Sequence, residues 1–124
     1  MKRHAATGAA ILAGSDFPVL KMAEEIARTH HEWWDGGGYP LGLEEEEIPL
    51  TGRIVAVVDV FDALTHRRPY KPAWSVSEAI AEIHRLTGRQ FDPAVVAAFD
   101  KLDPHALVEP DPERATRRNL VAVA

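Results

Sequence analysis

The spacing of apolar residues along the chain predicts helices. In residues 4–12 and again in residues 19–30, apolar and small side chains recur every three or four positions, which is the period of one helix face. The stripe in the second segment consists of Val19, Ala23, Ile26, Ala27 and His30. We therefore expect a helix that runs to about His31, with His30 facing the core.

Capping residues mark where three of the predicted helices begin. The capping candidates are Ser15 or Asp16, Ser75 or Ser77, and Asp92. A proline follows inside the first turn at Pro18 and at Pro93, where its missing N–H costs nothing. Together with the apolar periods, these signals predict an all-α fold of about five helices.

Residues 51–66 form the most apolar segment. Their valines favour a strand by propensity, but the length and nearly unbroken apolar character favour a buried helix. Asp59 is the anomaly in it, because a buried carboxylate needs a cation or several hydrogen-bond donors. Arg53, on the same segment, is a candidate partner for such an ion pair.

Composition narrows the class of protein. A length of 124 residues fits one domain, and the absence of cysteine excludes disulfides and thiolate metal sites, which agrees with the cytoplasmic location that we expect. No stretch approaches the roughly eighteen consecutive apolar residues of a membrane span. The net charge of −5 argues against a nucleic-acid polymer as partner, so phosphate recognition would need a local basic patch such as residues 67–71.

Several of the candidate functional residues lie in the run from His30 to Pro40. Two adjacent histidines and a glutamate precede a glycine-rich loop, and the loop region from 32 to 50 is longer than a plain connection requires. Imidazole and carboxylate suit Fe, Mn or Zn. We therefore expect His4, His30, His31 and Asp59 as metal ligands, with the adjacent histidines about 100° apart on a helix and each reaching a different metal.

Each of these residues also has an ordinary structural explanation. Taken alone, His4 would be a surface histidine, His30 a core histidine bonded to a backbone carbonyl, and Asp59 half of a buried ion pair. The loop residue Tyr39 would either pack on the domain or stack on a base and bond a phosphate. Arg68 and Lys71 would be surface residues or phosphate ligands. We expect no function for the other histidines, namely His66, His84 and His105.

Three further carboxylates are candidates for a supporting role. Glu32 could orient a ligand histidine from outside the metal's coordination sphere. Asp35 and the glycines after it are expected to fix the loop. Asp62 lies one helical turn after Asp59, and it could support the site or pair with Arg67 or Arg68.

Several of these motifs occur in the same order in a known family. The chain resembles the HD-GYP domains, a bacterial subgroup of the HD phosphohydrolases. The matching stretches are residues 1–4, 30–40, 48–50 with 53–54, 59–65, 68–71 and 91–93. The resemblance implies an HD-domain-like helical bundle with a long loop carrying Gly38-Tyr39-Pro40.

The resemblance also implies an activity and a site. It implies metal-dependent hydrolysis of cyclic di-GMP to pGpG and GMP, at a site of two or three metals that are usually Fe or Mn, with Zn as a further option. His4, His30, His31 and Asp59 match the family's metal-ligand positions. Positions that contact the cyclic dinucleotide are matched by Tyr39, Arg68 and Lys71.

One departure from the family bears on activity. The chain contains no His-Asp dipeptide, which is the other signature of the family. We therefore expect residues 1–103 to be a partial HD-GYP domain without the helices that carry this pair, and residues 104–124 to be a C-terminal tail. Four ligands would not complete a two-metal clamp, so the chain alone should be weak or inactive while its intact parent is an enzyme.

The same departure keeps other functions open. The alternative is a non-catalytic module of bacterial signalling that binds cyclic di-GMP or a protein. By resemblance, the protein partners would be diguanylate cyclases or receiver domains. Apolar faces left uncovered would favour homo-oligomers. A third option is another HD-type phosphohydrolase that acts on a different nucleotide, which the Gly38-Tyr39-Pro40 loop disfavours.

Overall fold

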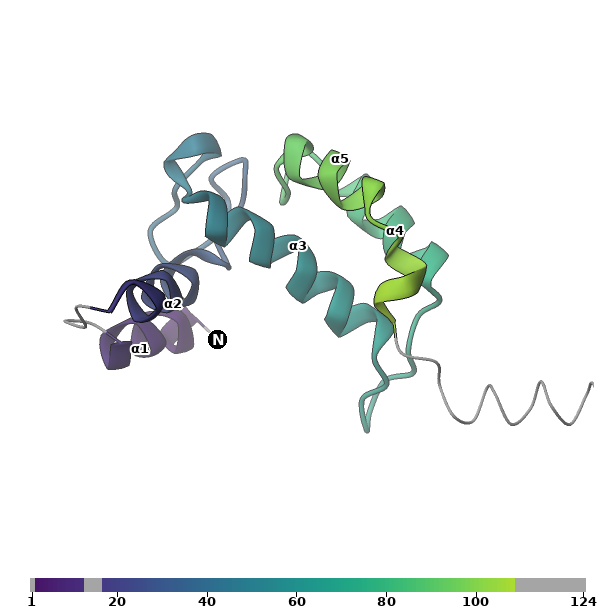
Figure 1. Cartoon of the computed structure of the whole chain (residues 1–124), viewed down its shortest axis with the longest axis horizontal. Coiled ribbons are helices and arrows are strands. Elements are labelled where there is room, and N and C mark those ends of the chain that lie inside the picture. Colours follow the sequence, from purple (N-terminus) through teal and green to yellow (C-terminus); the bar gives the residue numbers. More distant parts are fainter. Residues whose placement is uncertain (1, 13–16, 109–124) are drawn as a thin grey trace, which may run out of the picture.

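The predicted all-α fold is confirmed. The computed structural model describes residues 2–12 and 17–108, which form five α-helices and two short 3₁₀ helices (Figure 1). In chain order the elements are α1 (Lys2–Leu12), α2 (Pro18–Thr29), η1 (Glu45–Glu47), α3 (Leu50–Thr65), α4 (Val76–Arg85), α5 (Pro93–Lys101) and η2 (Pro104–Leu107). Within the described ranges, none of these helices has the length and apolar character needed to cross a membrane.

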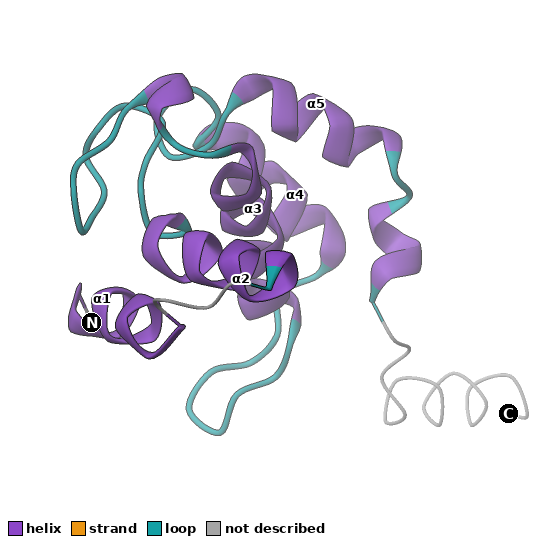
Figure 2. Cartoon of the chain, turned by 60° about the vertical axis from the view of Figure 1, so that its left-hand side comes forward, coloured by secondary structure: helices purple, strands orange, loops and turns teal. Residues whose placement is uncertain are grey.

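Helix α3 is the centre of the molecule. It packs on α2 on one side and on α4 and α5 on the other, while α1 packs on α2 (Figures 1 and 2). The largest buried cluster joins α3, α4 and α5, and its fully buried side chains include Val57, Ile83 and Phe91. Phe61 of α3 meets Phe99 of α5 edge to face, with ring centroids 5.1 Å apart, which is a favourable aromatic geometry.

The expectation that α3 is buried all round is wrong. Ile54 and Val58 are 44% and 50% exposed, and Asp59 is exposed as well. Ile54 and Val58 are exposed because α3 and α5 leave an apolar groove of about 470 Å³ between them, whose lining also includes Leu50 and Leu102. Asp59 is therefore not a buried carboxylate, and its position in the helix carries no burial penalty.

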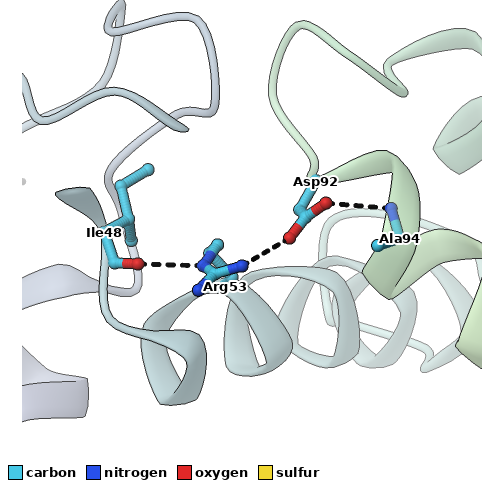
Figure 3. A network of polar contacts seen from close by, with 4 residues as sticks. All are labelled: Ile48, Arg53, Asp92 and Ala94. Atoms are coloured by element: carbon cyan, nitrogen blue, oxygen red, sulfur yellow. Dashed lines mark hydrogen bonds and ion pairs between the residues drawn. The ribbon is translucent and has the colours of Figure 1, made fainter. Parts of the chain in front are cut away.

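Arg53 does not pair with Asp59, as one alternative had it, but with Asp92. Figure 3 shows the arrangement: the Arg53 guanidinium donates from Nε to the Ile48 carbonyl at 2.9 Å and from Nη1 to the Asp92 carboxylate at 2.7 Å. The other Asp92 oxygen accepts from the Ala94 N–H at 2.9 Å, which makes Asp92 the predicted cap of α5. One chain of bonds thus joins the end of the loop, α3 and α5.

The other helix starts follow the predictions in part. Ser75 caps α4 by accepting from the Glu78 N–H at 3.1 Å, and Pro18 lies in the first turn of α2. Helix α2 begins after Phe17 without a side-chain cap, and the candidates Ser15 and Asp16 lie outside the described residues.

The predicted apolar stripe of α2 is wrong at its start, since Val19 is 72% exposed. Its second half, including Ile26 and Ala27, is partly buried.

The proposed boundary after residue 103 remains a prediction. Helix η2 follows it directly, and Val108 packs against the core cluster. The rest of the predicted tail, with its arginines and its apolar end, lies outside the described residues.

Candidate metal centre

His30 stands at the end of α2 with its ring orientation fixed. Helix α2 ends at Thr29, and His30 is its C-cap, with φ −71° and ψ −9°. The His30 Nδ1 lies 2.7 Å from the Ile26 carbonyl oxygen. Because a carbonyl can only accept, Nδ1 carries the proton and Nε2 keeps a free lone pair. This is the hydrogen bond that usually orients a metal-binding imidazole.

Three histidines meet at this helix end. His4 of α1, His30 and His31 each offer a ring nitrogen, and these three nitrogens lie within 4.8 Å of one another. The His4 and His31 Nε2 atoms are 2.6 Å apart. Two imidazole nitrogens this close need a proton or a cation between their lone pairs. The donor set, three imidazoles without thiolate, suits a divalent transition metal.

The predicted divergence of the adjacent histidines does not occur. Their ring centroids are 4.0 Å apart, because α2 ends before His31 and the 100° rotation between neighbours in a helix does not apply. His31 lies in the turn after the helix, which directs its ring back toward His30 and His4.

The charge state of His31 favours ligation. Burial lowers the pKa of the His31 imidazole, and the neighbouring His30 and His4 lower it further, while the Asp59 carboxylate raises it. The net direction is downward, so the neutral form, which is the metal-binding form, dominates at neutral pH.

Asp59 lies near the histidines but outside their group. It is close enough to act electrostatically on His31, yet its oxygens are not among the atoms that lie within 4.8 Å of one another. It is exposed on the middle of α3, the helix against which α2 packs. The fourth predicted ligand is therefore beside the cluster and not in it.

The loop after His31 is anchored by the Glu32 carboxylate. The Glu32 carboxylate is 2% exposed and accepts from the Leu41 N–H at 2.6 Å and from the Leu43 N–H at 2.9 Å. Both oxygens are thus used to hold the returning half of the loop. The expectation that Glu32 orients a ligand histidine has no support in these contacts, and its role is to position the loop.

Gly38 is required by close packing of the same loop. A Cβ atom on Gly38 would collide with the Trp33 nitrogen and the His31 carbonyl oxygen, and it would lie 2.7 Å from the Glu32 carbonyl carbon. These are backbone atoms, which cannot move aside cheaply. Asp35 fixes the loop as predicted, since its Oδ1 accepts from the Gly37 N–H at 2.8 Å.

Tyr39 lies against the histidine cluster. Its ring stacks on the His31 ring with centroids 5.1 Å apart and an angle of 23° between the planes. The Tyr39 N–H donates to the His31 carbonyl at 3.1 Å. The peptide bond between Tyr39 and Pro40 is cis. The loop therefore brings this phenol to the edge of the candidate metal site.

Gly52 is a site residue that the sequence reasoning missed. A Cβ on Gly52 would collide with the Thr29 hydroxyl and lie 2.9 Å from the Thr29 Cβ. Thr29 is the last residue of α2, directly before the histidines. The absent side chain lets α3 approach the helix end that carries the site. An isolated glycine inside an apolar helix was the available signal.

The basic residues lie on a hairpin beyond α3. Arg68 and Lys71 face each other across an antiparallel bridge, and both are exposed. They are not in the histidine cluster but follow the end of the helix that carries Asp59.

Asp62, on the same helix, lies 3.1 Å from the Nδ1 of His66. His66 therefore has a carboxylate neighbour, and it is exposed as expected.

Comparisons with known proteins agree with this architecture. Residues 1–95 match the family model described as HD domain. The chain is 53% identical over 103 residues to a cyclic di-GMP phosphodiesterase of Thermotoga maritima, covering 83% of this chain and 28% of that protein. It is 51% identical over 99 residues to the cyclic di-GMP phosphodiesterase response regulator RpfG of Xanthomonas campestris, covering 80% and 26%.

A solved structure of a phosphodiesterase is also similar to this chain. The cyclic GMP-AMP-specific phosphodiesterase V-cGAP3 of Vibrio cholerae superposes with a TM-score of 0.62 at 30% identity, over 82% of this chain and 22% of that one. The chain therefore belongs to the HD domain family, and its resemblance to the HD-GYP domains is confirmed. It spans about a quarter of the length of these relatives. Family membership implies dependence on a divalent metal.

Proposed function

We propose that this chain carries the metal-binding part of a phosphodiesterase that hydrolyses cyclic di-GMP to pGpG and GMP. The observation that carries the proposal is the convergence of the His4, His30 and His31 nitrogens at the end of α2. Neutral imidazoles with an outer hydrogen bond, as at His30, fit a divalent cation. The proposed substrate class, cyclic di-GMP, comes from the names of the relatives.

The proposed ligands are the three histidines together with Asp59. Asp59 is the fourth proposed ligand, because it is an exposed carboxylate whose charge acts on His31. Fe or Mn fits a set of imidazole and carboxylate, and Zn fits the same set. When bound, such a cation supplies Lewis-acid activation of the phosphodiester and of the attacking water.

The chain's own residues would bind and orient the dinucleotide. Tyr39, held against His31, would place its hydroxyl or ring against the substrate next to the reacting phosphate. Arg68 and Lys71 would neutralise a phosphate from the hairpin, Arg68 with a planar fork and Lys71 as a point charge. Asp35 would act indirectly by fixing the loop that carries Tyr39. Asp62 stays a candidate for a supporting role beside Asp59 on α3.

One experiment tests the catalytic proposal. The full chain is stripped of metal, reloaded separately with Fe²⁺, Mn²⁺ or Zn²⁺, and incubated with cyclic di-GMP, with pGpG and GMP followed by chromatography. We expect weak turnover with Fe²⁺ or Mn²⁺ that a chelator abolishes, because four ligands alone do not complete a two-metal clamp. His30→Ala should lose more than the roughly 10- to 100-fold typical of residues that only orient a ligand, and the exposed His84→Ala should lose none. Unchanged turnover in His30→Ala would refute the proposal.

A specific observation favours a second candidate. The chain has no His-Asp dipeptide, and among the described residues one group, the three histidines His4, His30 and His31, is placed to hold a metal. A non-catalytic module that binds cyclic di-GMP, or a protein such as a diguanylate cyclase or receiver domain, would need no second metal. Calorimetric binding of cyclic di-GMP without formation of pGpG in the same sample would establish that module instead.

The substrate can also be narrowed by experiment. Some relatives are named for cyclic di-GMP, and others, including the structural neighbour from Vibrio cholerae, are named for cyclic GMP-AMP. Parallel turnover assays with cyclic di-GMP and 3'3'-cGAMP compare kcat/KM for the two directly. We expect the higher value for cyclic di-GMP, because the relative named for it is 53% identical over 103 residues, against 45% over 96 residues for a relative named for 3'3'-cGAMP.

A further inference from the structure

We propose that Tyr70, at the tip of the hairpin between α3 and α4, stacks on a base of the cyclic dinucleotide and contributes to its binding. The inference rests on the proposed function and adds a residue to it. It follows from the geometry of the hairpin, from the exposure of the ring and from the charges that flank it.

The hairpin holds Tyr70 in a defined place. The Arg68 N–H donates to the Lys71 carbonyl at 3.0 Å, and the Lys71 N–H donates to the Arg68 carbonyl at 3.1 Å. Pro69 and Tyr70 are the two residues of the turn, and proline restricts the backbone there. The Trp74 N–H donates to the Leu64 carbonyl at 2.8 Å and closes the base of the hairpin on α3. An ordered turn of this kind presents its tip without a large entropy cost on binding.

The ring of Tyr70 has no part in the core. It is 85% exposed, the highest value among the exposed large hydrophobic residues of the described chain. Single exposed apolar residues are common on protein surfaces, so exposure alone does not assign a role. A large ring held at the tip of a two-residue turn between two cationic side chains is a more specific arrangement.

The charged residues beside Tyr70 indicate which kind of ligand would bind there. Arg68 and Lys71 are both exposed on either side of it, in a chain whose net charge is −5. The Lys71 ammonium lies 5.8 Å from the centre of the Trp74 ring, which keeps it near the base of the hairpin and away from the tip. Positive charge beside an exposed aromatic ring matches a nucleotide, whose phosphate pairs with the cations while its base stacks on the ring.

The hairpin follows the end of α3, the helix that carries Asp59 beside the candidate metal centre. Asp59, Asp62 and His66 are spaced by three and four positions, so they line one face of α3 down to its end. Seven residues of helix correspond to about 10 Å, at a rise of about 1.5 Å per residue. Figure 1 shows the hairpin continuing beyond this end of α3. A cyclic dinucleotide with one phosphate near the histidines would carry a base toward this hairpin.

The test compares three substitutions at Tyr70 in the full chain loaded with Mn²⁺. Binding is followed by the fluorescence of a cyclic di-GMP analogue in which 2-aminopurine replaces one guanine, since stacking quenches this base. We expect wild type and Tyr70→Phe to bind with quenching. Tyr70→Leu and Tyr70→Ala should bind about tenfold more weakly, with less quenching at saturation. Melting temperatures should agree among all four proteins, because the ring is outside the core.

The outcomes separate this inference from the proposed function. If wild type binds or hydrolyses cyclic di-GMP, and Tyr70→Ala and Tyr70→Leu bind the analogue with the same affinity and quenching, the role of Tyr70 is refuted while the proposed function stands. If wild type neither binds nor hydrolyses the dinucleotide, both fall. For active protein, we expect the loss in Tyr70→Ala in KM and not in kcat, as for a group that binds substrate away from the reacting phosphate.

Discussion

Arg53 of α3 and Asp92, the cap of α5, form an ion pair in which Nη1 and Oδ2 are 2.7 Å apart. The two residues are 39 positions apart in the sequence, and their side chains are only 18% and 4% exposed. Each also binds the backbone, Arg53 at the Ile48 carbonyl and Asp92 at the Ala94 N–H. The pair therefore fixes the end of the loop that carries Tyr39 relative to both α3 and α5.

Removing the Asp92 carboxylate should destabilise the chain strongly. Asp92→Ala leaves a largely buried guanidinium without its anion and α5 without its cap, and we expect a loss of about 3 to 5 kcal/mol in the free energy of unfolding. Asp92→Asn keeps an acceptor for the Ala94 N–H and should lose less. Urea denaturation measures both. The exposed Asp100→Asn is the control, with a loss below about 1 kcal/mol. Equal losses in Asp92→Ala and Asp100→Asn would contradict this role.

Gly38 should tolerate no side chain. The Cβ of Gly38→Ala would collide with backbone atoms of Trp33 and His31, so the loop must move and Tyr39 must leave the His31 ring. We expect Mn²⁺ affinity to fall at least tenfold, as when an orienting group is lost. In Gly37→Ala, the matched control, the Cβ meets the Asp35 carboxylate at 3.0 Å, and that side chain can adjust. Isothermal titration with Mn²⁺ compares the two, and equal affinities would show that Gly38 does not shape the site.

Metal binding should stabilise the native chain through the three histidines. A cation that binds only the folded state adds about 2.7 kcal/mol at a hundred times its Kd, so excess Mn²⁺ should raise the melting temperature by several degrees. His4→Ala, His30→Ala and His31→Ala should each abolish most of that shift. His66→Ala should retain it, because His66 is exposed at the far end of α3. A shift that persists in His31→Ala would exclude this cluster as the site.

The sequence predicted those parts of the fold that depend on local signals. The five helices, the caps Ser75 and Asp92 and the prolines in the first turns follow from residues close together in the chain. The candidate metal ligands came from co-occurrence of residue types and from the family resemblance. Three of the four converge in the structure, namely His4, His30 and His31.

What the sequence could not predict depends on tertiary packing. Glu32 was expected to orient a histidine, but its two backbone donors come from positions 41 and 43, which only the folded loop brings near. The adjacent histidines were expected on different helix faces, but α2 ends at Thr29, two residues before the expected end, and the two rings lie together. The partner of Arg53 lies 39 positions away, beyond any local pattern. The exposure of Ile54 and Val58 depends on where α5 leaves the groove that these side chains line.

Two glycines in helices allow a matched comparison of packing near the site. Gly52→Ala in α3 places a methyl against the Thr29 hydroxyl and Cβ, so α2 and α3 must separate just before the histidines. We expect a loss of about 1 to 3 kcal/mol from overpacking, together with weaker Mn²⁺ binding. Gly8→Ala in α1 places its Cβ 3.4 Å from the Ala27 Cβ, an ordinary contact, and should stabilise by up to about 1 kcal/mol through helix propensity. Urea denaturation measures the stability of both variants, and Mn²⁺ titration measures their metal affinity. If Gly52→Ala were as stable as Gly8→Ala and bound Mn²⁺ equally well, the close approach of α3 would not position the end of α2.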